Sequence, residues 1–254
     1  MSQDVTLFEG LLPDRVRWAQ AVIPEPPVGP GTATAYPETI EAGLFPEERE
    51  HIARSVAKRR AEFAAVRRCA RRALHELGYP PVPILPGEQR EPRWPEGVVG
   101  SMTHCSGYCA AAVARSGEVP ALGIDAEVHA PLPEGVLELI SLETERDRLV
   151  ALAKAESDSV HWDRVLFSAK ESVYKAWFPL TRRWLGFEQA DIELRPDGSF
   201  EARVLSAQDG ADDAVSGAAS SSGPASPSGA PRGFAGRWAV SGGLIATAIG
   251  EVVG

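Results

Sequence analysis

We predict an α+β fold of two similar subdomains, each a helix packed on a small, mainly antiparallel sheet, with a ligand cleft between them. Two observations support this prediction. A helical pattern followed by short strand-like runs occurs twice along the chain, which indicates two related halves. The dipeptide Asp197-Gly198 is typical of a hairpin turn, which indicates antiparallel pairing. We expect an N-terminal half over residues 1–120 and a C-terminal half over 121–254.

The first half begins with a Pro- and Gly-rich segment at 24–37, which predicts irregular structure. Pro46 and the acids after it suit the first turn of a helix, and apolar residues then recur at helical spacing until Gly78. These signals predict one long helix over 46–77, followed by a proline-rich loop over 80–95. Three short apolar runs then predict strands at 98–102, 108–114 and 121–127.

The second half has the clearer helix, over 161–177, with one apolar stripe from Trp162 to Trp177. Helical patches with a polar surface precede it within 134–156. Residues 207–232 are rich in Ala, Ser, Gly and Pro and lack aromatic residues, so we expect a flexible insertion between two strands of one sheet. Three or four strands are predicted after the helix, within 191–195, 200–205, 237–240 and 244–249.

The composition excludes several classes of protein. The chain has 254 residues, of which 44% are hydrophobic and 24% charged, as in ordinary globular proteins. Its net charge of −9 argues against broad nucleic-acid binding. No apolar run approaches the roughly 18–20 residues of a membrane span, and no signal-peptide pattern is visible. Three cysteines, an odd and low number, suit a reducing compartment, so we expect the cytoplasm.

The first candidate site is the run G-I-D-A-E at 123–127. Positions two apart on a strand share a face, so Asp125 and Glu127 point the same way. Two adjacent carboxylates repel each other unless a cation lies between them, and Mg²⁺ prefers such oxygen ligands. The alternative is a strand end that carries two solvated acids.

The second candidate lies on the helix at 167–177. Glu171 is about 180° around the helix from Trp162, at ~100° per residue, so it faces away from the apolar stripe. Lys170 and Lys175 are half of the four lysines in the chain, and lysine is a compact charge suited to phosphate. The alternative is an exposed Glu–Lys pair that stabilises the helix only slightly.

Two further segments are candidates. Ser101, Thr103 and His104 end a predicted strand; a zinc site with the two nearby cysteines is disfavoured because no second cysteine pair completes it. The helix segment 54–72 holds eight of the 26 basic residues against one acid, which indicates an anionic partner. The alternative for this segment is a helix balanced by acids elsewhere.

In combination, these motifs resemble the 4′-phosphopantetheinyl transferase superfamily, in its single-chain, pseudo-dimeric type that acts on carrier proteins of secondary-metabolite and lipid synthases. The resemblance rests on G-S-M-T-H at 100–104, G-I-D-A-E at 123–127, F-S-A-K-E-S-V-Y-K-A-W at 167–177, the basic stretch 58–71 and the aromatic stretch 177–187. It covers most of residues 45–205 and the final hairpin. It implies coenzyme A bound in the cleft between the halves.

The resemblance also implies residue roles. Asp125, Glu127 and Glu171, with help from the Ala126 carbonyl, would hold Mg²⁺, with Mn²⁺ as an alternative. Glu171 would act as base, and His104 and Lys175 would stabilise charge. The implied coenzyme A contacts come from both halves: Arg59, Arg67, Pro86, Gly87, Glu88, Gln89, Ser101, Thr103, His104, Asp125, Lys170, Glu171, Tyr174, Lys175 and Trp184.

One loop departs from the family pattern. Members often carry a lysine before the glycine of this loop, where this chain has Pro86 before Gly87. Arg90, or backbone groups of 86–89, would have to take over its role.

The implied reaction transfers 4′-phosphopantetheine from coenzyme A to a serine of an apo acyl or peptidyl carrier protein, and the carriers of this family are acidic helical bundles. We expect a monomer, because one chain contains both halves. Two other functions fit the same residues: a non-catalytic coenzyme A or nucleotide-binding module, and a Mg²⁺-dependent hydrolase of nucleotide pyrophosphates.

Overall fold

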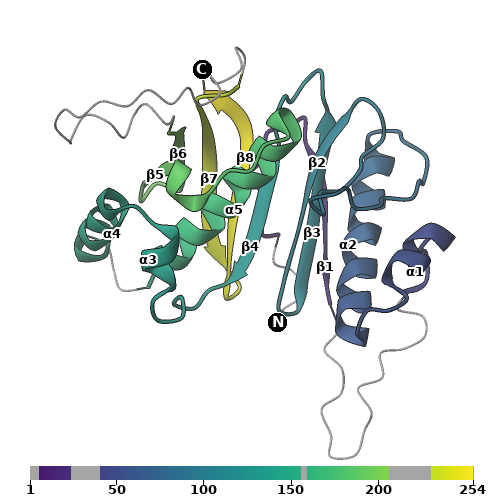
Figure 1. Cartoon of the computed structure of the whole chain (residues 1–254), viewed down its shortest axis with the longest axis horizontal. Coiled ribbons are helices and arrows are strands. Elements are labelled where there is room, and N and C mark those ends of the chain that lie inside the picture. The colour runs from purple at the N-terminus through teal and green to yellow at the C-terminus, as the bar shows by residue number, and fades with distance from the viewer. Residues whose placement is uncertain (1–5, 24–40, 156–158, 206–229, 254) are drawn as a thin grey trace, which may run out of the picture.

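The computed structural model of the chain describes residues 6–23, 41–155, 159–205 and 230–253 (Figure 1). It contains a three-stranded sheet of order β1–β3–β2 and a five-stranded sheet of order β4–β8–β7–β6–β5, both antiparallel. Helix α2 covers the first sheet and α5 covers the second (Figure 1). The predicted α+β fold is therefore confirmed. The segment 24–37 and most of 207–232 lie outside the described residues.

In the first half, the single helix predicted over 46–77 is wrong, because the chain turns between Ile52 and Ala57. Ile52 and Phe63 pack in one small buried cluster, whereas a straight helix would hold them about 16 Å apart. Strand β1 was not predicted, since only its Ala19 is buried. The elements are β1 (Arg17–Val22), α1 (Pro46–Ile52), α2 (Ala57–Glu76), β2 (Val98–Cys105) and β3 (Tyr108–Arg115).

In the second half, the predicted strands and the main helix are confirmed. The apolar stripe of α5 packs against the five-stranded sheet in the largest buried cluster. No helix in the described ranges has the length and apolar character needed to cross a membrane. The elements are β4 (Gly123–Val128), α3 (Val136–Ile140), α4 (Glu143–Ala155), α5 (Trp162–Thr181), the 3₁₀ helix η2 (Phe187–Gln189), β5 (Ala190–Leu194), β6 (Ser199–Val204), β7 (Gly233–Ser241) and β8 (Leu244–Val253).

The two halves meet where β2 lies beside β4. The Ile124 N–H donates to the Ser101 hydroxyl at 3.0 Å, and the Ala126 N–H donates to the Thr103 hydroxyl at 3.0 Å. Side-chain hydroxyls of β2 thus satisfy backbone groups of β4, which buried amides require. The division at residue 120 between the two halves stays a prediction.

Helix α5 approaches β4 unusually closely at Gly123. A Cβ atom there would lie 2.0 Å from the Ser172 carbonyl oxygen and 3.1 Å from the Ala176 nitrogen. Only glycine permits this approach, which explains the glycine that begins the G-I-D-A-E run. The close contact sets the side chains of α5 directly above Asp125, the third residue of that run.

Candidate active site

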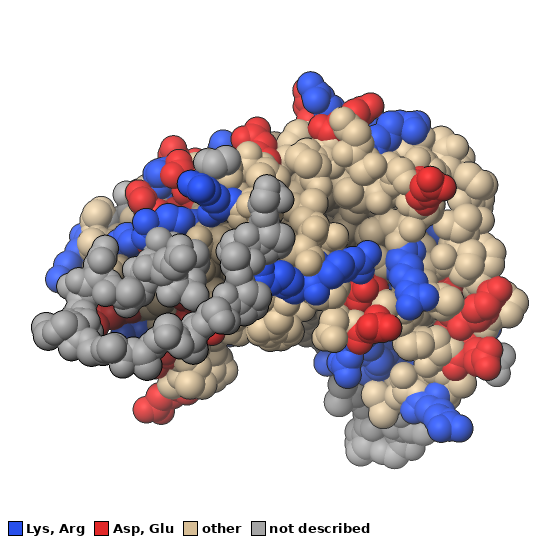
Figure 2. Space-filling model, turned by 45° about the horizontal axis from the view of Figure 1, so that its top comes forward, with Lys and Arg blue, Asp and Glu red and all other residues tan. Residues whose placement is uncertain are grey.

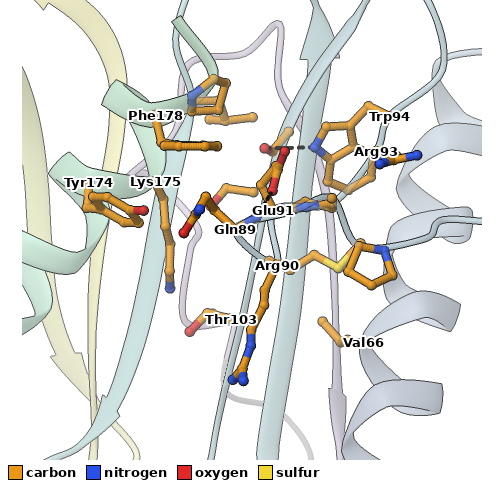
Figure 3. Close-up of a pocket in the computed structure, with 18 of the residues that line it drawn as sticks. Val66, Gln89, Arg90, Glu91, Arg93, Trp94, Thr103, Tyr174, Lys175 and Phe178 are labelled. Atoms are coloured by element: carbon orange, nitrogen blue, oxygen red, sulfur yellow. Dashed lines mark hydrogen bonds between the residues drawn. The ribbon is translucent and has the colours of Figure 1, made fainter. Parts of the chain in front are cut away.

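A cavity of about 1650 Å³ lies between the two halves. Its walls come from α2, the loop 86–94, β2, β4 and α5, so every candidate segment of the sequence contributes to it (Figure 3). The volume exceeds that of typical small-ligand sites, which are roughly 300–1,000 Å³, and suits a large ligand. Among the residues that we predicted for the site, only Ala126 and Lys170 do not line the cavity.

Asp125 is held from three sides at the floor of the cavity. Its Oδ1 accepts hydrogen bonds from the Lys175 ammonium at 2.7 Å and from the Thr103 hydroxyl at 3.1 Å. Its Oδ2 accepts one from the Ser168 hydroxyl at 2.8 Å. The carboxylate is nearly buried, with 4% of the residue exposed, so these partners replace the water it has lost. The carboxylate is therefore fixed in one orientation.

Two glutamates face the same cavity as Asp125. Glu127 lies two positions further on β4 and pairs with Arg164 at 3.2 Å. Burial and the charge of Asp125 raise the pKa of Glu127 to about 7, despite Arg164. Burial also raises the pKa of Glu171 on α5; the charge of Lys175 opposes this shift and that of Asp125 adds to it. Burial is the largest cause of both shifts, so each glutamate is protonated more readily than a glutamate in water.

This donor set fits a divalent cation in its chemistry. Three carboxylates face one cavity, and their mutual repulsion would be relieved by a cation with oxygen ligands. No three His, Cys, Asp or Glu side chains of the described ranges are gathered as a ready ligand set. The carboxylates of β4 instead carry the basic partners Lys175 and Arg164. Ala126, predicted as a ligand through its carbonyl, is buried, and its N–H is bonded to Thr103.

The opposite wall of the cavity is cationic. Arg67 on α2 lies with its guanidinium carbon 3.2 Å from the centre of the Phe63 ring and donates its Nε to the Ile84 carbonyl at 3.0 Å. Burial lowers the pKa of Arg67 to about 9; the charge of Glu48 opposes this shift and that of Arg59 contributes to it. An anion bound against this wall would relieve that penalty.

Arg59 and His104 form a hydrogen-bonded pair beside Arg67, in which Arg59 carries the charge. Arg59 donates to the His104 ring nitrogen Nε2 at 2.8 Å, so the ring accepts at that atom. Partial removal from water lowers the pKa of His104 below its ordinary value, and the charges of Arg59 and Lys175 also lower it. The imidazole is therefore kept neutral in this arrangement. Figure 2 shows basic side chains across the middle of one face, with acidic ones just below them.

A buried carboxylate that we did not predict organises this wall. Glu48 of α1 is 0% exposed and accepts hydrogen bonds from Arg71 at 2.8 Å, the Ile84 N–H at 2.8 Å and the Phe45 N–H at 2.9 Å. It ties α1 and α2 to Ile84, two residues before the loop 86–94. A glutamate in a first helical turn is usually exposed, so the sequence contained no signal for this role.

The cavity loop 86–92 is closed by a bridge between Pro86 and Pro92. Arg90 adopts a left-handed conformation with φ 67°, and its side chain extends toward Thr103, as does Lys175 from the other side (Figure 3). Glu91 pairs with Arg182, at the end of α5, at 2.9 Å. Pro86 brings no charge to the cavity, whereas Arg90 of the same loop lines it. That Arg90 takes over the role of a lysine at position 86 stays a prediction.

At the mouth of the cavity, the Trp184 ring lies 5.0 Å from the Tyr174 ring, centre to centre. Trp184 is 71% exposed, although tryptophan is mostly buried in folded proteins. Together they provide an apolar edge at the entrance.

Lys170 requires a correction, because the structure places it away from the cavity. Its ammonium donates to the Phe187 carbonyl at 2.7 Å, the Ala190 carbonyl at 2.8 Å and Glu145 at 2.9 Å. Burial lowers its pKa, which the charge of Glu145 opposes. All three ammonium hydrogens are thus used, so Lys170 joins α5 to α4 and β5 and has no donor left for a ligand.

The disfavoured zinc site is not assembled. Cys109 is packed beneath α2, with its sulfur 3.8 Å from that of Cys69, while Cys105 packs in the cluster on the other face of the sheet. All three cysteines are free.

Comparison with known proteins shows the family of the chain. A family model described as the 4′-phosphopantetheinyl transferase N-terminal domain matches residues 47–114, and one described as the 4′-phosphopantetheinyl transferase superfamily matches 121–220. The chain is 50% identical over 230 residues to 4′-phosphopantetheinyl transferase Svp of Streptomyces mobaraensis, covering 90% of this chain and 87% of Svp. It is 50% identical over 210 residues to 4′-phosphopantetheinyl transferase PptT of Mycobacterium tuberculosis, covering 81% and 85%.

A more distant relative is enterobactin synthase component D of Escherichia coli K12, 37% identical over 121 residues, or 47% of this chain and 55% of the relative. Family models match both halves of the chain, and two relatives are 50% identical to it over most of its length. These matches assign the chain to one family. The chain belongs to the 4′-phosphopantetheinyl transferase superfamily, enzymes that move the phosphopantetheine arm of coenzyme A onto carrier proteins.

Proposed function

We propose that this protein transfers 4′-phosphopantetheine from coenzyme A to a serine hydroxyl of an apo acyl or peptidyl carrier protein and releases adenosine 3′,5′-bisphosphate. One observation carries the proposal at the level of residues: a single cavity has carboxylates and Lys175 on one wall and arginines on the other. A phosphate-rich nucleotide and a divalent cation are the partners that this division of charge favours.

The arginine wall would hold the phosphates of coenzyme A. Arg67 and Arg59 of α2 provide planar donors, and Arg90 extends into the same cavity from the loop (Figure 3). Arginine pairs with phosphate through two parallel hydrogen bonds, which fixes orientation as well as charge. His104, bonded to Arg59 on this wall, and Lys175, bonded to Asp125 on the other, both line the cavity, and the reacting pyrophosphate would be placed between them.

Asp125 and Glu127 would hold Mg²⁺, or Mn²⁺, with Glu171 as a third carboxylate. Such an ion, when bound, supplies charge stabilisation to phosphoryl oxygens. Lys175 would add a fixed positive charge beside Asp125, which costs no reorganisation during the reaction.

Glu171 would act as the general base. The serine oxygen attacks the phosphorus atom that bears the pantetheine arm, the bond from that phosphorus to the bridging oxygen breaks, and the serine proton passes to Glu171 directly or through water. The raised pKa of Glu171 brings its basicity closer to neutral pH, which suits proton transfer there.

The carrier would approach the mouth of the cavity near Trp184. Arg182 and Arg183 are exposed beside it and would attract an acidic carrier despite the negative total charge. We further propose that the enzyme acts as a monomer in the cytoplasm, because one chain forms the whole cavity and all three cysteines are free.

The test is an incubation with coenzyme A, Mg²⁺ and several apo carrier proteins, followed by intact mass of each carrier. A gain of one phosphopantetheine arm supports the proposal. Cleavage of coenzyme A without a carrier would instead indicate a pyrophosphate hydrolase, and binding without turnover on every carrier would indicate a non-catalytic module. Asp125→Ala is expected to abolish transfer, whereas Glu171→Gln should lower turnover more than coenzyme A binding. Near-normal turnover of Glu171→Gln at saturating carrier would refute the role as base.

A further inference from the structure

Behind Asp125, three hydroxyl side chains form a continuous hydrogen-bonded chain that the proposed chemistry does not use. Ser168 and Ser172 lie one turn apart on α5, and Thr247 lies on β8 between them. All three residues are 0% exposed. The Ser172 and Thr247 hydroxyl oxygens are 2.6 Å apart, those of Thr247 and Ser168 are 3.0 Å apart, and Ser168 reaches Asp125 Oδ2 at 2.8 Å.

The protons of this chain point in one direction. A carboxylate only accepts, so the Ser168 hydroxyl spends its one hydrogen on Asp125. Thr247 then donates toward Ser168, whose hydroxyl and carbonyl oxygens lie 3.0 and 2.9 Å from it. Ser172 donates to Thr247, which has both its hydroxyl and its carbonyl within reach. Whether each hydrogen goes to the hydroxyl or to the carbonyl oxygen of the next residue, Ser172 supports Thr247 and Thr247 supports Ser168.

The three hydroxyls lie on one side of Asp125, so that one carboxylate oxygen faces the protein interior and the other faces the cavity. Oδ2 is bound from behind by Ser168, while Oδ1 is turned toward Thr103 and Lys175, which line the cavity. Without Ser168, the carboxylate loses its only partner at Oδ2 among the described residues and is held through Oδ1 alone. Its terminal torsion has a broad profile, so Oδ2 can then turn away from its present position.

We propose that Ser168, supported by Thr247, is a positioning residue that holds the Asp125 carboxylate in the orientation needed to bind a divalent cation. This inference rests on the proposed function, in which Asp125 is a metal ligand. Groups that orient a ligand from behind typically change metal affinity or activity by about 10–100-fold when removed.

The helix provides a matched control. Ser172 is as buried as Ser168, lies on the same helix and bonds to the same Thr247, but it does not touch Asp125. Replacing either serine by alanine removes one buried hydroxyl from one network. The comparison therefore separates the loss of a buried hydrogen bond from the loss of an Asp125 partner.

The experiment measures binding of Mn²⁺ alone, and in the presence of coenzyme A, by the electron paramagnetic resonance signal of free Mn²⁺. Wild type, Ser168→Ala, Ser172→Ala and Thr247→Val are compared as full-length proteins, together with their thermal unfolding and the Mg²⁺ concentration for half-maximal transfer. We expect Ser168→Ala to raise the Mn²⁺ dissociation constant and the half-maximal Mg²⁺ concentration at least about 10-fold. Ser172→Ala should stay within about twofold, with a similar loss of thermal stability, and Thr247→Val should lie between them.

Equal shifts in the two serine variants, or no shift in Ser168→Ala, would overturn the proposal. If Ser168→Ala does not fold, the comparison of Thr247→Val with Ser172→Ala decides, because of these two residues it is Thr247 that donates to Ser168. If the wild-type protein transfers normally and Ser168→Ala and Ser172→Ala bind Mn²⁺ equally well, only the positioning role is refuted. If the wild-type protein modifies no carrier, but Ser168→Ala binds Mn²⁺ more weakly than Ser172→Ala, the proposed reaction is refuted and the positioning role is supported. Wild-type protein that binds no Mn²⁺ refutes both.

Discussion

The ammonium nitrogen of Lys175 lies 2.7 Å from Oδ1 of Asp125 and 3.1 Å from the Ile124 carbonyl oxygen. This pair joins α5 to β4 at the floor of the cavity. Lys175, one of the four lysines of the chain, is half-buried. Its ammonium group lies beside the carboxylate that would bind the metal ion and would face the phosphates of coenzyme A.

We expect Lys175→Gln to lower kcat for carrier modification by about 100-fold, because one preorganised donor to a developing phosphoryl charge is typically worth that much. The variant should bind Mn²⁺ no more weakly than wild type, since a neighbouring ammonium repels a cation. The measurements are steady-state kinetics by carrier mass and Mn²⁺ binding. Lys154→Gln, at an exposed position of α4, is the control. A variant that loses Mn²⁺ binding and kcat together would show that Lys175 acts mainly by ordering Asp125.

Glu127 makes stability depend on pH in a defined direction. Its pKa in the folded protein is about 7, above the ordinary value of 4.5, so folding takes up a proton between these values. Raising the pH through this window therefore destabilises the metal-free protein through Glu127. We expect Glu127→Gln to gain about 1 kcal/mol or more of unfolding free energy relative to wild type between pH 5 and pH 8.

The measurement for Glu127 is urea unfolding of both proteins in EDTA at four pH values across that range. A difference between the two proteins that is constant with pH would contradict the raised pKa. Added Mg²⁺ should reduce the gain at pH 8, because a bound cation stabilises the ionised carboxylate of wild type.

Arg67 combines three contacts that a lysine cannot reproduce: the Phe63 ring face, the Ile84 carbonyl and the cavity. We expect Arg67→Lys to raise the KM for coenzyme A about 10-fold with kcat changed less than about threefold, because binding in the ground and transition states is lost equally. Arg72→Lys, exposed on the same helix, is the matched control. A fall in kcat with unchanged KM would place Arg67 at the reacting phosphate instead.

Much of the fold and site could be predicted from the sequence because its signals are local. Apart from β1, the strands of both sheets follow from periodicity, as does the apolar stripe of α5. G-I-D-A-E with K-E-x-x-x-K identified Asp125, Glu171 and Lys175, all of which line the cavity. These motifs lie on regular elements, where spacing fixes direction.

What could not be predicted depends on contacts between distant segments. Lys170 and Lys175 are about 140° apart around one helix, so at most one of them faces a given wall. The side chain of Lys170 turns toward Glu145, a buried residue of a helix with only weak periodicity. The role of Thr247 could not be predicted either, because no local pattern indicates that it bonds to Ser168, which is 79 positions away in the sequence.

Gly123 makes the most demanding prediction about packing. An alanine Cβ would lie 2.0 Å from the Ser172 carbonyl oxygen, a backbone atom that cannot turn aside, so α5 would have to move away from β4. We expect Gly123→Ala to cost roughly 2–3 kcal/mol of unfolding free energy. Transfer should fall as well, because the move separates Lys175 from Asp125.

Gly117→Ala is the control for this prediction, since a Cβ there meets no atom within 4 Å. Urea unfolding gives the stability of both variants, and carrier mass gives their transfer rates at saturating Mg²⁺ and coenzyme A. If Gly123→Ala matched Gly117→Ala in stability and rate, the close approach of α5 to β4 would not be required. A stable Gly123→Ala protein with slow transfer would show instead that the distance between α5 and β4 sets the rate directly.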